Sequence, residues 1–117
     1  MDYATRALPT VILLEHGDQV FTLSELKYYG EEYYADSAKE WTIKIETSLC
    51  DIFVINSLLH KEFDLITESI AKNIEGKEVS LNAVFSGVSI EHFSYDIDTE
   101  GDPTIFTIHF KAREKMI

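Results

Sequence analysis

The fold is decided by Val88-Ser89-Ile90-Glu91-His92-Phe93-Ser94-Tyr95-Asp96-Ile97 and, after a short loop, by Thr104-Ile105-Phe106-Thr107-Ile108-His109-Phe110-Lys111-Ala112. Both runs alternate apolar and polar residues, as strands with one face on a core do. The apolar side chains of one face are expected to meet across a hairpin. They are Phe93, Tyr95 and Ile97 on the first strand and Phe106, Ile108 and Phe110 on the second. This closing hairpin predicts part of a sheet and contains no catalytic motif.

Working outward, the size of the chain predicts one domain that spans residues 1–117. A mass of 13.4 kDa fits a single domain and leaves little room for a second. A hydrophobic fraction of 45% is sufficient for a true core, so we do not expect an intrinsically disordered chain.

The acidic charge limits the function classes. A net charge of −11 repels phosphate backbones, so we expect no sequence-specific binding of nucleic acid. Two acidic alternatives remain: a DNA mimic, or a protein that lets DNA pass without gripping it.

Membrane and secretory classes are not expected. The start at Met1 lacks a basic leader, and the apolar run Val11 to Leu14 is too short to span a membrane. The single cysteine, Cys50, has no internal partner for a disulfide. The sequence therefore predicts a cytoplasmic protein in which Cys50 is a buried, reduced thiol.

Three strands are expected in the first half of the chain. Leu8-Pro9 opens a short apolar strand from Thr10 to Glu15, because proline suits a strand's first position. The next stretch is expected to be an extended or bent strand followed by the polar loop Ala35 to Lys39. Trp41 to Thr47 alternates cleanly and is expected to be a strand, with Ile52 to Ile55 as its bulged continuation.

A helix is expected from Ser57 to Glu75. Apolar residues recur there at helical spacing, Asn56 or Ser57 offers a cap, and Gly76 stands where a helix-ending glycine belongs. The apolar positions are Leu59, Phe63, Ile66, Ile70 and Ile74. The resulting order is β-β-β-α-β-β. It defines the α+β class, in which one main helix packs on a mixed or antiparallel sheet.

No residue pattern indicates catalysis, a cofactor or a complete metal site, so we do not expect an enzyme. His92 and His109 are expected to face each other on the polar side of the closing hairpin. They could bind a transition metal or sense pH, but a solvated cross-strand pair is favoured because no third ligand has suitable spacing. Asp98, Glu100 and Asp102 similarly favour a plain acidic turn over a calcium loop.

A protein-binding surface is the better candidate. Tyrosines beside acidic residues supply contact area at low entropic cost, although the same residues could equally cover a sheet edge. Exposed apolar strand edges would also need a partner, and self-association into a closed ring would cover them. The candidate interface residues are Tyr28, Tyr29, Tyr33, Tyr34, Phe53 and Ile55.

The whole layout resembles the tail terminator family of long-tailed bacteriophages, the lambda-type minor tail protein U group. The stretches that carry the resemblance are Leu8 to Leu14, Trp41 to Glu46, the expected helix Ser57 to Glu75, and the closing hairpin. A related tail-completion or neck protein is the alternative within this resemblance.

This resemblance implies a structural virion protein without a cofactor. It would form a ring, expected to be a hexamer, that caps the tail tube, joins it to the head-tail connector and lets DNA pass. Its partners would be copies of itself, the tail tube and the connector, in the host cytoplasm during assembly and then in the virion tail or neck. The alternative is an acidic DNA mimic that inhibits a host defence nuclease. Lysines interspersed among the acids favour the ring protein.

Overall fold

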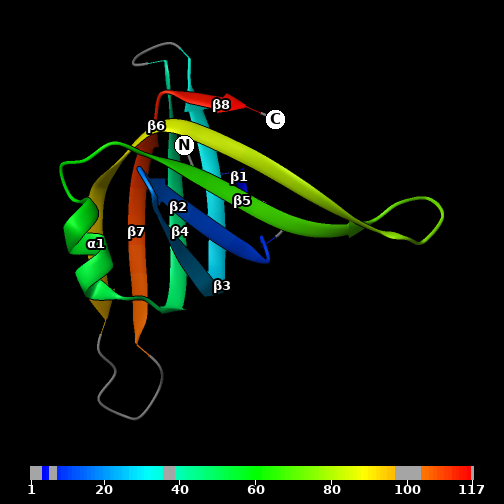
Figure 1. Ribbon diagram of the computed structural model, residues 1–117, viewed down its shortest axis with the longest axis horizontal. Helices are drawn as coiled ribbons and strands as arrows, with labels where there is room; N and C mark the ends of the chain where they lie inside the picture. Colours follow the sequence, from blue (N-terminus) through cyan, green and yellow to red (C-terminus); the bar gives the residue numbers. More distant parts are fainter. Residues whose placement is uncertain (1–3, 6–7, 36–38, 97–103, 117) are drawn as a thin grey trace.

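The computed structural model describes residues 4–5, 8–35, 39–96 and 104–116. Its strands are β1 (Ala4–Thr5), β2 (Val11–His16), β3 (Gln19–Tyr34), β4 (Glu40–Leu49), β5 (Phe63–Lys72), β6 (Glu78–Asp96), β7 (Ile105–Ala112) and β8 (Glu114–Met116). One short helix, α1 (Ile52–Leu58), lies between β4 and β5 (Figure 1).

The strands close into a barrel. They pair in the order β3-β2-β5-β6-β7-β4, and β4 pairs with β3 again, which completes the circuit. Every pairing is antiparallel. The two short strands lie outside this circuit, with β1 on β3 and β8 on β6.

Two long strands turn the corners of the barrel. β3 pairs with β2 through residues 19–23 and then with β4 through residues 24–34. β6 likewise pairs with β5 through residues 78–88 and with β7 through residues 89–96. Each change of partner coincides with a register shift and with a residue at positive φ, Glu25 in β3 and Gly87 in β6. Such bulges bend a strand and increase its twist, which allows one strand to serve both sheets.

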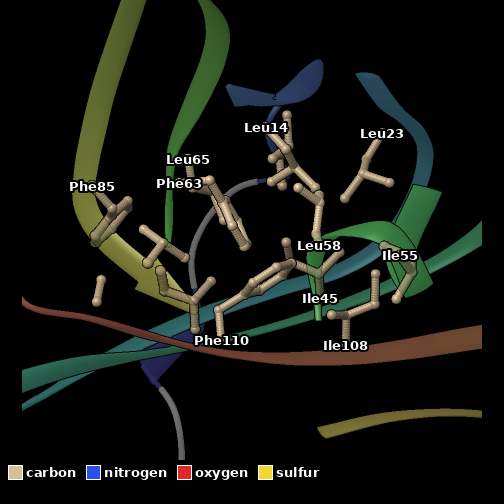
Figure 2. Close-up of a cluster of buried hydrophobic side chains, with 14 of the residues drawn as sticks. Leu14, Leu23, Ile45, Ile55, Leu58, Phe63, Leu65, Phe85, Ile108 and Phe110 are labelled. Carbon is tan, nitrogen blue, oxygen red and sulfur yellow. The ribbon is translucent and has the colours of Figure 1, made fainter. Parts of the chain in front are cut away.

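The core lies inside the barrel and is built by alternation. In β2, β4, β5 and β7 the buried core side chains fall at alternate positions, as Ile12 and Leu14 do in β2. Aromatic rings meet edge to face across the interior, with Phe63 and Phe110 at 6.1 Å between ring centroids. Figure 2 shows Leu65, Phe85, Ile45 and Ile108 in this cluster.

Helix α1 covers the barrel with one face. The Asp51 carboxylate caps its start and accepts a hydrogen bond from the Phe53 amide at 2.9 Å. Ile55 and Leu58 are fully buried, and Figure 2 shows both directed into the core near Leu23 and Ile108. With only seven residues, the helix depends on this burial for its stability.

The expected α+β class is wrong, because 73% of the described residues are strand and 7% are helix. The expected main helix, Ser57 to Glu75, is occupied mainly by β5. Phe63, Leu65 and Thr67 are buried at alternate positions there, so a period of two operates where the apolar spacing suggested 3.6. Gly76, expected to end that helix, lies at φ +77° in the turn between β5 and β6. The expected strand Ile52 to Ile55 is helical.

The other sequence-based elements are confirmed. The strand after Leu8-Pro9 is β2, the bent strand is β3, and the alternating run after it is β4. The closing hairpin is the second half of β6 with β7, and Phe93 and Tyr95 face Ile108 and Phe106 as expected. Ile97, residues 98–103 of the acidic loop, and residues 36–38 of the polar loop lie outside the described residues. Among the described helices, none is long and apolar enough to cross a membrane.

Candidate functional site

The two histidines of the closing hairpin meet as expected. His92 and His109 are directly paired across β6 and β7, with 5.8 Å between their ring centroids. Burial lowers the pKa of His109, and electrostatic repulsion from Lys44 and His92 lowers it further. Within the described part of the chain, no group of three or more histidine, cysteine or acidic side chains is arranged to hold a metal ion. The described residues therefore place no third metal ligand beside this pair.

The outer face of β4, β6 and β7 is a mosaic of opposite charges. Lys111 lies 3.5 Å from Glu40 and 3.5 Å from Glu91, and these carboxylates raise its pKa. Lys44 lies 4.0 Å from Glu46, and its ammonium group is 5.4 Å from the centroid of the Tyr28 ring. The charged side chains make this face hydrophilic. Exposed ion pairs of this kind contribute little to the stability of the fold.

The tyrosine cluster divides between the interior and the surface. Tyr29 is buried, and its hydroxyl donates to the Glu31 carboxylate at 2.6 Å. Tyr28 is half-buried under Lys44. Tyr33 and Tyr34 are exposed, and Tyr33 packs at 5.1 Å on the ring of Trp41. Of these four tyrosines, only Tyr33 and Tyr34 offer substantial area to a partner.

A buried ion pair lies inside the barrel beside Tyr29. Glu31, on β3, is directed inward and pairs with Lys115 of β8. The ammonium group of Lys115 also lies 5.0 Å from the Trp41 ring centroid and 5.4 Å from that of Phe85. Sequence reasoning missed this cluster, although Glu31 follows Tyr29 at the spacing that puts both on one face of a strand.

An exposed apolar surface surrounds the start of α1. We call Leu49, Ile52 and Phe53 the helix-end patch; their exposed fractions are 60%, 38% and 86%. Ile55, which was expected in an interface with Phe53, is fully buried in the core and leaves no area for a partner. A helix presents residues two apart on different sides, which explains why the expected pair is split.

A second apolar surface lies on the hairpin that joins β5 and β6. We call residues 69–81 the arm, which projects from the barrel in Figure 1. Its turn is held by the Asn73 side-chain oxygen, which accepts hydrogen bonds from the amides of Glu75 and Lys77, each at 3.0 Å. Ile70, Ile74 and Leu81 are exposed to 60%, 103% and 56%. The sequence signal for this surface is the pair of isoleucines, whose spacing also fits the apolar face of a helix.

Cys50 does not form a reactive site. Burial, followed by the charge of Asp51, raises the pKa of its thiol to about 11. Because the thiolate is the nucleophile, little of the reactive form exists at neutral pH.

The fold is shared with Hcp proteins. No protein-family model and no curated protein sequence matches the chain. A crystal structure of an Hcp protein matches with a TM-score of 0.63, over 93% of this chain and 90% of that one, at 9% identity. Hcp1 from Flavobacterium johnsoniae matches with a TM-score of 0.51, over 91% and 93% of the two chains, at 13% identity. At such identities the likeness establishes the fold, an Hcp-type barrel. Neither structure is a lambda-type tail terminator.

Proposed function

We propose that this protein is a structural subunit that assembles with copies of itself into a ring of the phage-tail type. The likeness to the Hcp proteins carries the proposal, because it extends over nearly the whole length of both chains. Self-association into rings belongs to this class of tail-like structural proteins. The proposed role is mechanical and needs no catalytic group or cofactor.

The surfaces of the barrel support self-association. The helix-end patch and the arm both expose large apolar side chains, among them Phe53 and Ile74. Exposed apolar area that gathers in this way is typical of protein-protein contact. The mosaic of charges around Lys44 and Lys111 is instead suited to contact with water.

Two roles within this class compete: a subunit of the tail tube itself, and a terminator that caps the tube. The Hcp likeness favours the tube subunit. The resemblance to tail terminators rested partly on a helix from Ser57 to Glu75, where the chain forms β5. In either role the protein would reside in the tail of a virion or a tail-like particle, with other tail proteins as neighbours.

The net charge of −11 suits a ring through which DNA or another polyanion passes, because like charges prevent sticking. It would also suit a DNA mimic. A mimic needs carboxylates in a phosphate-like array, whereas Lys44 and Lys111 sit among the acids of the outer sheet face. This arrangement favours the ring.

Mass measurement and electron microscopy test the proposal. Size-exclusion chromatography with light scattering is expected to show about 80 kDa, six times the 13.4 kDa of one chain. Negative-stain images are expected to show rings. Stacks of rings at high concentration would identify a tube subunit, and rings that remain single would identify a terminator. A monomer at every concentration would contradict the proposal.

A further inference from the structure

The helix-end patch and the arm lie at opposite ends of the molecule. Figure 1 is drawn with the longest axis horizontal, and it places α1 at one side and the turn between β5 and β6 at the other. The longest extent of the molecule is 46 Å. One protomer therefore cannot bring its own arm onto its own helix-end patch.

The arm extends the core face of the barrel beyond the barrel. Residues paired across β5 and β6 share a face, and Leu65 with Phe85 is the last such pair that is fully buried. The following pairs on that face are mostly small or apolar, and Leu81 is already 56% exposed. These pairs are Thr67 with Ala83, Ser69 with Leu81, and Ala71 with Val79. The apolar face thus continues along the arm, beyond the point where the other barrel strands bury it.

A partner would also stabilise the arm. A two-stranded hairpin alone in water is marginally stable, and three strands or a packed apolar face are needed for more. The tip residue Ile74 is 103% exposed, although burial of an isoleucine side chain is favourable. An apolar surface on a second molecule would pack against the arm and would bury Ile74.

The distribution of charge favours a second copy of the chain as that molecule. Copies of a chain with a net charge of −11 repel each other, so contact is easiest where charge is lowest. In residues 69–81, two lysines and two glutamates cancel. The segment from Leu49 to Leu59, which contains the helix-end patch, includes one charged residue, Asp51. These two apolar surfaces can meet with little repulsion.

We propose that the arm of each protomer docks on the helix-end patch of the next, with Ile74 and Leu81 against Phe53 and Leu49. This inference rests on the proposed ring and names its contact. The contact joins two different surfaces, so a pair of docked protomers still has a free arm at one end and a free helix-end patch at the other. Such head-to-tail contacts close into a ring when the rotation between neighbours permits.

Cysteine cross-linking tests the contact. In a Cys50→Ser background, which removes the only native thiol, Ile74→Cys and Phe53→Cys are made as separate proteins. Both sites are exposed, so neither substitution disturbs the core. Mixed under mild oxidation, the two variants are expected to give a disulfide-linked heterodimer as the main product. A matched control pairs Ile74→Cys with Asp18→Cys, an exposed site in the turn between β2 and β3, and should give much less.

A second variant tests the energetics without cysteines. Ile74→Asp adds a charge at the tip of the arm and is expected to shift the ring toward monomer by at least tenfold in concentration, with an unchanged circular dichroism spectrum. Ile74→Val, which stays apolar, should retain the ring.

The outcomes separate this contact from the proposed function. Rings that persist with Ile74→Asp and give no preferred 74–53 cross-link would overturn the arm contact and leave the ring intact. If the unmodified protein is monomeric at every concentration, both ideas fail. Loss of the ring in Ile74→Asp together with the specific cross-link supports the contact.

Discussion

Lys115 of β8 forms an ion pair with Glu31 of β3 in the interior of the barrel. The two residues lie 84 positions apart in the chain, and only 16% of the lysine side chain and 4% of the glutamate are exposed. β8 pairs with β6, so this contact ties the end of the chain to a strand that it does not pair with. The cation also lies over the rings of Trp41 and Phe85, which adds cation-π attraction to the charge pair.

Lys115→Met is expected to destabilise the protein by about 3 kcal/mol, because breaking a buried ion pair by removing one partner is strongly destabilising. Glu31→Gln combined with Lys115→Met should recover most of the loss. Glutamine is neutral and still accepts the hydrogen bond from Tyr29. Urea unfolding at a fixed protein concentration measures both. The control Lys61→Met, at an exposed site, should change stability by less than about 0.5 kcal/mol. Equal losses at positions 115 and 61 would refute a buried, paired lysine.

The sequence predicted the elements whose signal is local. β4 and the closing hairpin alternate without interruption, so the inward and outward faces of Ile43, Lys44 and Ile108 could be assigned in advance. The pairing of His92 with His109 followed from the same alternation. These predictions depend only on neighbours in the chain and on the two-residue period of a strand.

The elements that depend on distant contacts were not predicted. The isoleucines at 66, 70 and 74 fit a helical period, but β5 is fixed by its pairing with β2 on one side and β6 on the other. Helix α1 is too short for a clear periodic signal and exists because Ile55 and Leu58 are buried. Barrel closure and the Lys115–Glu31 pair join distant parts of the chain, which no local pattern reports.

Gly87→Ala is expected to cost about 1–2 kcal/mol, because Gly87 lies at φ +61°, where an L-residue with a Cβ is strained. An added Cβ would also lie 3.0 Å from the Arg113 side chain, which would have to shift. Gly17→Ala is the matched control, since Gly17 has φ +60° and no neighbouring atom within 4 Å of an added Cβ. Thermal or urea unfolding should show a loss for both and a larger loss at position 87. A larger loss at position 17 would contradict the role of Gly87 at the corner of β6.

Cys50 is expected to react with thiol reagents about tenfold more slowly in the folded protein than in urea at pH 8. A rise of its pKa from 9.0 to about 11 reduces the thiolate about a hundredfold, and the greater nucleophilicity of the more basic thiolate offsets part of this. Asp51→Asn should accelerate labelling modestly, because burial is the larger cause and Asp51 the smaller. Asparagine also caps helices, so α1 should persist. Labelling at the same rate with and without urea would show that the thiol is not protected.

The pKa of His109 predicts that the protein loses stability as the pH falls through about 6.5, the ordinary value for histidine. Burial and the charges of Lys44 and His92 lower this pKa in the folded state, so the unfolded chain binds the proton more readily. Stability therefore rises with pH across this range, and the contribution is fully present only above the unfolded pKa.

Urea unfolding at pH 7.5, 6.5 and 5.5 measures this slope, and His109→Gln is expected to flatten it. Lys44→Met should flatten it partly, because the pKa of His109 then returns toward its ordinary value, while Lys61→Met serves as the control for the loss of a lysine. Glu91 and Glu46 act in the opposite direction on His109, so Glu91→Gln should steepen the slope. A slope that is the same in the unmodified protein and in His109→Gln would show that the histidine pair does not couple folding to pH.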